Sequence, residues 1–291
     1  MYSLIRQKSV ANADFAPGKE AYMSIASIKA QLAQYGLTPN KALGQNFLAD
    51  DMAAEEIAAS CKGAVIEIGP GMGALTEKLL NRPEQVAAVE IDRRMAEILK
   101  DRFGGRLMLI EGDVLKTDIK EIAESLGGAV SIAGNLPYYI TTPICTQLIT
   151  CGADIRSMTL MMQKEAAERF FAKPGDRVYG PLTVLAQYYY DVSALLKLSR
   201  EAYYPQPEVD SVVLKLERKE TEHHPMLHWL LESAFAMRRK TLSNNLKAAG
   251  ISDGRLNETC EAVGIQPNIR AEKLTPAQFA AISGEIEAHG K

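Results

Sequence analysis

Short apolar runs of strand length alternate with stretches of helical spacing over the first two thirds of the chain. Five of these runs have the length and composition of buried strands, at 64–69, 86–91, 107–112, 129–134 and 158–163. Because helical stretches separate them, the pattern predicts a parallel sheet that is covered on both faces. A helix is expected near 181–190, followed by strands at 192–199 and 211–219 that only a loop connects. A connection of that kind predicts an antiparallel pair at one edge of the sheet.

From about Thr221 the spacing becomes helical only. Four helices are expected, at 225–235, 239–249, 256–264 and 276–286. The change predicts a first domain over 23–220 and a smaller helical domain over 221–291. Residues 1–22 lack the apolar core of a signal peptide, and Asp14 and Glu20 argue against a transit peptide. We expect a mobile extension there that the chemistry does not need.

A glycine-dense turn joins the first strand to a helix at 74–80. Gly69, Gly71 and Gly73 allow the backbone to turn tightly and to approach a ligand without a Cβ in the way. The second strand ends in Glu90, 21 residues after Gly69, which is the spacing of an acid that holds a ribose diol. The glycine pattern also fits a NAD site, so by itself it leaves two classes of cofactor open.

The tetrapeptide Asn135-Leu136-Pro137-Tyr138 follows the fourth strand. It places an amide, a backbone carbonyl, a rigid ring and a π-face close together, a set that suits binding of the exocyclic amine of a flat base. An ordinary strand-to-loop turn is the alternative, because Asn and Pro are common in turns. The third strand leads to Asp113, which could accept a hydrogen bond from an adenine amine. Two acids at successive strand ends, followed by this tetrapeptide, favour S-adenosylmethionine over NAD.

From about Leu37 to its end the chain resembles the ribosomal small-subunit RNA adenine dimethyltransferases of bacteria, the KsgA/RsmA family. The motifs KALGQNFL, EIGPGMGALT, VEID, EGDVLK and NLPYYITTP occur in the family's order, and the stretches at 163–189, 204–216 and 235–246 match its later part. The resemblance implies an α/β fold, a Rossmann-like class I methyltransferase with a mostly parallel seven-stranded sheet, plus a small all-helical C-terminal domain. It also implies S-adenosylmethionine-dependent dimethylation of two adjacent adenosines near the 3′ end of 16S rRNA, in small-subunit biogenesis.

The cofactor residues follow from the motifs and the resemblance. Glu90 is expected to hold the ribose hydroxyls and Asp113 the adenine amine, while Gly69 and Gly71 admit the methionine portion. By resemblance, further contacts come from Gln45, Asn46, Leu48 and Asn135. For Glu67, a direct cofactor role and a structural role in ordering the glycine turn are equally good interpretations.

The catalytic residues are expected to act by positioning. The Asn135 side-chain oxygen and the Leu136 carbonyl would each accept one N–H of the target amine, which directs its lone pair toward the methyl group. Pro137 stiffens the loop, and Tyr138 stacks on the base. No strong general base is required. The base must leave its stack, which favours single-stranded or loop adenosines.

Charge gives a weaker indication of RNA binding. A net charge of −3 and a pI near 5.9 are unusual for an RNA-binding protein, so binding would need a local positive face. Arg238, Arg239 and Lys240 form a dense basic cluster, with Lys247 one or two turns on. The resemblance favours RNA binding by this cluster over a solvated helix face. A second cluster surrounds a Pro-Gly loop that we expect at the active-site mouth: Lys164, Arg169, Lys173 and Arg177.

Other residues predict a cytoplasmic monomer without metal. The four cysteines show no Cys-x-x-Cys spacing, which favours reduced thiols in a cytoplasmic protein. All four histidines follow Thr221, and His223 and His224 have no acidic or cysteine partners in the sequence, so we expect surface residues and no metal site. No apolar stretch approaches the ~20 residues that span a bilayer.

Three other functions remain open at this point. A macrolide-resistance methyltransferase shares most motifs but modifies large-subunit RNA, and a pI of 5.9 is low for that class. A DNA adenine methyltransferase would normally have a second proline where this chain has Leu136. An assembly or transcription factor could keep the fold and act by binding alone, although Glu90, Asp113 and the tetrapeptide are intact.

Overall fold

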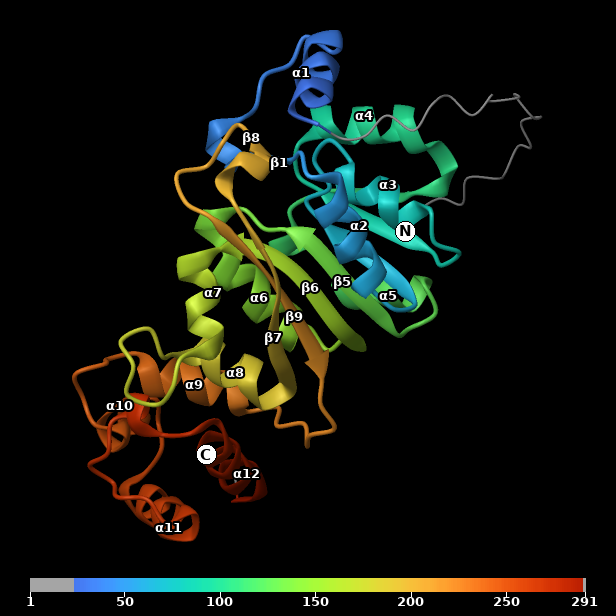
Figure 1. Ribbon diagram of the computed structural model, residues 1–291. Helices are drawn as coiled ribbons and strands as arrows, with labels where there is room; N and C mark the ends of the chain where they lie inside the picture. Colours follow the sequence, from blue (N-terminus) through green and yellow to red (C-terminus); the bar gives the residue numbers. More distant parts are fainter. Residues whose placement is uncertain (1–23, 290–291) are drawn as a thin grey trace.

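The computed structural model describes residues 24–289, so the expected N-terminal extension lies outside the described residues. Seven strands form one sheet in the order β4-β3-β2-β5-β6-β9-β7 (Figure 1). Their bounds are β2 (Ala64–Ile68), β3 (Val86–Glu90), β4 (Met108–Glu111), β5 (Val130–Asn135), β6 (Ile155–Gln163), β7 (Tyr190–Leu198) and β9 (Ser211–Arg218). The pairs from β4 to β6 are parallel, and β9 is antiparallel to both β6 and β7. The mostly parallel seven-stranded sheet is thereby confirmed.

Helices cover both faces of this sheet. Consecutive residues of β2 point in opposite directions, so that Val65 belongs to one apolar core and Ile66 to the other. The first core is built with α1 (Ile25–Gln34), α2 (Asp51–Ser60), α3 (Ala74–Leu80) and α4 (Arg93–Phe103). The second is built with α5 (Ile119–Ser125), α6 (Thr141–Thr150), α7 (Lys164–Phe171) and α8 (Pro181–Tyr189). No helix within residues 24–289 is long and apolar enough to cross a membrane.

The four helices expected after Thr221 are present as α9 (Leu227–Phe235), α10 (Leu242–Ala248), α11 (Asp253–Val263) and α12 (Pro276–His289). They gather at the end of the molecule opposite α1 (Figure 1), and α9 and α12 pack on α8. Their buried residues, Leu230 and Phe279 among them, continue the core on the α6–α8 face of the sheet. The division into two domains near Thr221 stays a prediction.

One expectation about this region is wrong. His224 is a buried residue and not a surface residue: its Nδ1 lies 3.2 Å from Glu287 Oε2 on α12. Glu287 also accepts a hydrogen bond from the Met226 backbone N–H at 2.8 Å. A helix 63 positions away therefore supplies the closer acidic partner, and Glu222, two residues before His224, lies 3.9 Å from its Nε2.

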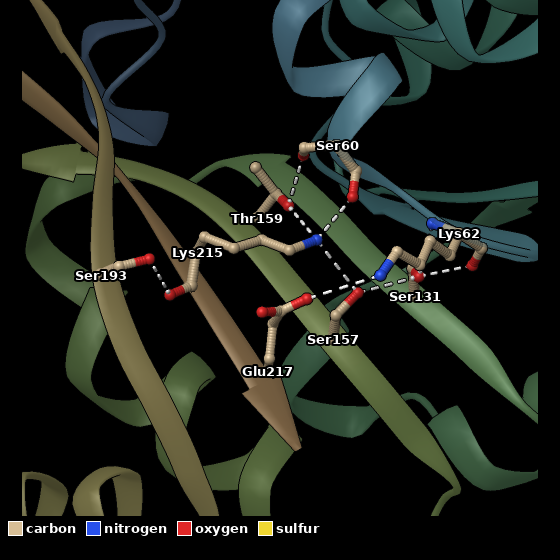
Figure 2. A network of polar contacts seen from close by, with 8 residues as sticks. All are labelled: Ser60, Lys62, Ser131, Ser157, Thr159, Ser193, Lys215 and Glu217. Atoms are coloured by element: carbon tan, nitrogen blue, oxygen red, sulfur yellow. Dashed lines mark hydrogen bonds and ion pairs between the residues drawn. The ribbon is translucent and has the colours of Figure 1, made fainter. Parts of the chain in front are cut away.

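A buried lysine fixes α2 over the sheet (Figure 2). Lys215, on β9, is 9% exposed, and its Nζ donates to the Ser60 carbonyl oxygen at 2.6 Å. The same Nζ lies 3.3 Å from Ser157 Oγ and 3.4 Å from Thr159 Oγ1, both on β6. Ser60 is the last residue of α2, so the ammonium group satisfies one of the carbonyls that a helix C-terminus leaves unpaired. Loss of hydration lowers the pKa of Lys215.

Candidate active site

An open cavity lies where β2, β3 and β5 end. Ten of the residues predicted from the sequence line it: Gln45, Asn46, Leu48, Gly69, Gly71, Glu90, Asn135, Leu136, Pro137 and Tyr138. Segments that are far apart along the chain therefore converge on one cavity.

The glycine turn has the backbone conformation expected of it. Gly69, Gly71 and Gly73 have φ angles of +66°, +56° and +81°, which residues with a Cβ rarely adopt. A Cβ on Gly73 would lie 2.6 Å from the Phe103 ring, and one on Gly71 would lie 3.0 Å from the Phe47 ring. These two positions require glycine for close packing as well as for backbone conformation.

Glu90 holds this turn at the end of β3. Its Oε2 accepts a hydrogen bond from the Gly71 N–H at 2.9 Å, and its Oε1 accepts one from the Asp92 N–H at 2.8 Å. The side chain is 4% exposed, and burial raises its pKa. A carboxylate has about four lone-pair positions, so these backbone donors leave room for a further donor. Contact with a ribose diol is compatible with this geometry and stays a prediction.

Glu67 connects β2 to the first turn of α3. Thr76 Oγ1 donates to Glu67 Oε2 at 2.7 Å, and the carboxyl group is 2% exposed. Burial, with a smaller contribution from the nearby Glu90 carboxylate, raises the pKa of Glu67 to about 8. Glu67 is therefore mostly protonated at neutral pH. It orders the helix that follows the glycine turn and also lines the cavity, so the structural role has a contact and the cofactor role stays a prediction.

The 41–48 segment covers one side of the cavity. It contains η1 (Lys41–Leu43) and β1 (Phe47–Leu48), and β1 pairs with β8 (Tyr203–Tyr204). Gln45 Nε2 donates to Asp92 Oδ2 at 2.8 Å, and Gln45 Oε1 accepts from the Asn40 N–H at 2.7 Å. Sequence reasoning missed Asp92, although it stands in the VEID motif two residues after Glu90. The hydrogen bonds from Arg94 lower the pKa of Asp92 and keep it ionised to bind Gln45.

The tetrapeptide has its amide group oriented by the same segment. Asn135 Nδ2 donates to the Asn46 backbone oxygen at 2.8 Å, across 89 positions of sequence. Within residues 24–289 no group donates to Asn135 Oδ1 or to the Leu136 carbonyl oxygen. The Leu136 N–H is bonded to the Met161 oxygen at 3.0 Å, which fixes the loop to β6. Asn135 Oδ1 and the Leu136 carbonyl oxygen are therefore both available to accept hydrogen bonds. The hydrogen bond to Asn46 keeps the Asn135 amide from flipping.

Tyr138 closes the other side of the cavity. Its hydroxyl lies 3.4 Å from Ser211 Oγ at the start of β9, and partial burial raises its pKa. The ring is neutral and lines the cavity, so it can offer a π-face.

Among the predicted catalytic and cofactor residues, Asp113 is the one that does not line the cavity. Its side chain instead accepts the Leu115 N–H at 3.0 Å and begins η3 (Val114–Lys116).

Comparison with known proteins identifies the family. The model of the family described as "Ribosomal RNA adenine dimethylase" matches residues 36–288. The chain belongs to this family. It is 41% identical over 274 residues to a protein of Geobacillus thermodenitrificans called ribosomal RNA small subunit methyltransferase A, covering 88% of this chain and 93% of that one. A protein of the same name from Moorella thermoacetica is 38% identical over 276 residues, 89% and 96% of the two chains.

Solved structures agree with this family fold. A dimethyladenosine transferase from Plasmodium falciparum superposes with a TM-score of 0.66 at 26% identity, over 84% of this chain and 98% of that one. The 23S rRNA methyltransferase ErmE has a TM-score of 0.59 at 24% identity, over 83% of this chain and all of that one. At that identity ErmE shows the shared fold alone. The Rossmann-like methyltransferase fold is confirmed.

In this family member the basic cluster 238–240 lies in a turn and not on a helix. Helix α10 begins only at Leu242, because Thr241 caps it by accepting the Asn244 N–H at 3.3 Å. Asn245 holds the turn from within: its Nδ2 donates to the Ala234 oxygen at 2.6 Å and the Met237 oxygen at 3.2 Å. Sequence reasoning missed Asn245, since an Asn in a helical stretch carries no distinctive signal. Lys247 is paired with Asp253 and so is not a free cation.

The second basic cluster is placed differently from the expectation. The Pro-Gly loop does not border the cavity: the Gly175 N–H donates to the Glu272 oxygen at 2.6 Å, so the loop lies against η6 (Ala271–Lys273) of the C-terminal helices.

The two basic clusters and η6 with its flanking residue supply exposed cations without an acidic partner. Nine of them form no ion pair within residues 24–289: Lys164, Arg169, Lys173, Arg177, Arg238, Arg239, Lys240, Arg270 and Lys273. Most cations on the β2–β4 half of the protein are neutralised by acids. Despite the net negative charge, local positive charge is therefore available.

Proposed function

We propose that the chain transfers methyl groups from S-adenosylmethionine to the exocyclic amine of two adjacent loop adenosines near the 3′ end of 16S rRNA, in biogenesis of the small ribosomal subunit. The observation that carries the proposal is the pair of available acceptors at Asn135 and Leu136, with the Asn135 amide held by Asn46. The small-subunit substrate is supported by the names of relatives that are about 40% identical over most of the chain.

The two acceptors answer the main chemical difficulty of the reaction. The lone pair of an adenine amine is delocalised into the ring, so the nitrogen is a poor nucleophile. If Asn135 Oδ1 and the Leu136 oxygen each accept one N–H, the nitrogen becomes more tetrahedral and its lone pair turns out of the ring plane. S-Adenosylmethionine, when bound, supplies an electrophilic methyl group. Bond formation makes the nitrogen acidic and water can take the proton, so the residues act by positioning and electrostatics.

The cavity has suitable groups for the cofactor. Glu90 has lone-pair positions left for the ribose hydroxyls, and Gly69 and Gly71 allow close approach of the methionine portion. The remaining proposed contacts are Gln45, Asn46, Leu48, Asn135 and, at the adenine amine, Asp113. Asp113 would have to keep its Leu115 hydrogen bond and use its second oxygen for adenine.

Binding to the subunit would use the unpaired cations. We assign phosphate contacts to Arg238, Arg239 and Lys240, because all three are exposed, unpaired and held in a well-anchored turn. Phosphate contacts supply affinity and register without reading sequence. The protein would act as a cytoplasmic monomer on the small subunit or its precursor.

The test is transfer of labelled methyl groups to small subunits that lack these methylations, compared with large subunits, DNA and buffer. Small subunits alone should accept the label; labelling of large subunits would instead indicate the macrolide-resistance activity. The Asn135→Ala variant should lower the single-turnover rate by about 10²-fold, by analogy with loss of one oxyanion donor. Asn268→Ala, on an exposed turn, is the matched control and should keep the normal rate.

Subunit binding separates positioning from affinity in the same experiment. Asn135→Ala should bind the subunit nearly normally, since most of that contact is with distant phosphates. Tyr138→Ala should lose about 1–3 kcal/mol of base stacking, while Tyr138→Phe keeps the π-face and should be mild. A normal rate for Asn135→Ala would show that the tetrapeptide is only a turn, and the mechanism would be wrong.

A further inference from the structure

An aromatic ring that the mechanism does not use lies at the rim of the cavity. Tyr139 follows Tyr138 in η4 (Tyr138–Ile140) and is 60% exposed, among the most exposed large apolar side chains within residues 24–289. Its hydroxyl forms no hydrogen bond with any described residue. An exposed ring without a polar partner is an available surface for stacking.

The ring of Tyr139 lies next to Gly44. Gly44 has a φ of +62°, and a Cβ built there would lie 3.3 Å from Tyr139 Cε1. Gly44, Pro137 and Tyr138 all line the cavity, whereas Tyr139 does not. The ring therefore lies against the outer side of two segments that form the cavity wall. Lys41, in the same short turn as Gly44, is exposed and unpaired within the described residues.

Packing alone does not explain the ring. The 41–48 segment is already held by the Gln45–Asp92 and Asn46–Asn135 hydrogen bonds and by the pairing of β1 with β8. The larger part of the Tyr139 surface remains exposed and contributes nothing to that attachment. Tyr139 directly follows Tyr138, the residue proposed to hold the target base.

We propose that Tyr139 stacks on the nucleotide adjacent to the target adenosine, outside the cavity. When the target base enters the cavity, its neighbour loses a stacking partner, and the Tyr139 ring replaces it. This inference rests on the proposed function, because it needs a base inside the cavity. It also makes Tyr139 a determinant of specificity, since a purine neighbour offers a larger face than a pyrimidine.

The experiment is a double-mutant cycle between the protein and the RNA. Small subunits are reconstituted with unmethylated 16S rRNA that carries an abasic nucleotide on the 5′ or the 3′ side of the target adenosine. On intact RNA, Tyr139→Ala should lower kcat/KM about 5- to 150-fold, the range that stacking on one base covers. On one of the two abasic RNAs, the native protein and Tyr139→Ala should be equal, because the partner of the ring is gone.

Two further variants separate stacking from packing. Tyr139→Phe should retain kcat/KM, whereas Tyr139→Leu, which still covers Gly44 but has no π-face, should be as slow as Tyr139→Ala. The affinity for S-adenosylmethionine, measured by calorimetry, should be the same in all variants. A normal rate for Tyr139→Leu, or losses that add fully on both abasic RNAs, would overturn the inference. If the native protein fails to methylate intact small subunits, the proposed function itself is wrong.

Discussion

Replacing Glu67 by Gln tests the electrostatics of the glycine turn. The carboxyl group is 2% exposed, has one hydrogen bond from Thr76, and has a pKa raised to about 8 by burial. Gln has nearly the same shape as the protonated acid and cannot ionise. The substitution should therefore keep the contact with Thr76 and remove the dependence of stability on the ionisation of this group.

The sign and size of this stability change follow from the linkage between proton binding and folding. A raised pKa means that the folded state prefers the protonated acid, so this stabilisation is complete below the unfolded pKa of about 4.5 and is lost as pH rises toward 8. At pH 7 the loss amounts to about 3 kcal/mol, from roughly 2.5 pH units at 1.36 kcal/mol each. Relative to the native protein, Glu67→Gln should gain stability by about 1.4 kcal/mol for each pH unit between 5 and 8.

Urea denaturation at pH 5, 6, 7 and 8 measures this difference. Glu56→Gln is a suitable control, because Glu56 is exposed on α2 and has no ion pair with any described residue. It should change stability little and equally at every pH. If the free energies of unfolding of Glu67→Gln and of the native protein change with pH in the same way, Glu67 is not protonated in the folded protein and the reasoning fails.

The same variant decides the cofactor role that the contacts leave open. A cationic group of the cofactor beside Glu67 would lower the pKa of Glu67, so binding at pH 7 should release up to one proton. Calorimetry in two buffers with different ionisation enthalpies measures that release. A direct contact predicts proton release by the native protein and none by Glu67→Gln. Equal proton release in both would leave Glu67 with its structural role alone.

Three other predictions concern separate parts of the molecule. Glu90→Ala should weaken cofactor binding by about 1.5–3 kcal/mol, because it removes hydrogen bonds to a charged acceptor; unchanged affinity in calorimetry would exclude Glu90 from the site. Reversing the charges of Arg238, Arg239 and Lys240 should weaken subunit binding and reduce its salt dependence by nearly one log unit per lost phosphate contact, with cofactor affinity unchanged. An unaltered salt slope would mean that this turn is merely solvated. Lys215→Met should lower the free energy of unfolding by about 1–3 kcal/mol, since the Ser60 carbonyl loses its donor. An unchanged free energy of unfolding would show that the hydrogen bonds of Lys215 contribute no net stability.

Much of the fold could be predicted from the sequence because the relevant signals are local. Short apolar runs predicted β2 and β3 to within about one residue, and the helical spacing of ALTEKLL predicted α3. The conformation of Gly69, Gly71 and Gly73 could likewise be anticipated, because only glycine adopts positive φ at little cost. The motifs also selected ten residues of one cavity.

The boundaries of the elements and their neighbours in space were harder to predict from the sequence. The capping hydrogen bond of Thr241 starts helix α10 after the basic cluster and not within it, whereas the antiparallel pair β7–β9 lies at one edge of the sheet as predicted. The Pro-Gly loop lies against η6 and does not line the cavity. The place of this loop depends on how elements pack, which a local pattern does not contain.

The sequence by itself determined the elements of this protein, the glycine turn and the residue types at the site. Only the tertiary structure decided which of those groups are available. Asn46 fixes the Asn135 amide from 89 positions away, and Glu287 buries His224 from 63 positions away. Burial by neighbouring elements, not the residue type, gives Glu67 its raised pKa. The physical reason is that hydrogen bonding and hydration depend on spatial neighbours, and these are set by the packing of elements that are remote along the chain.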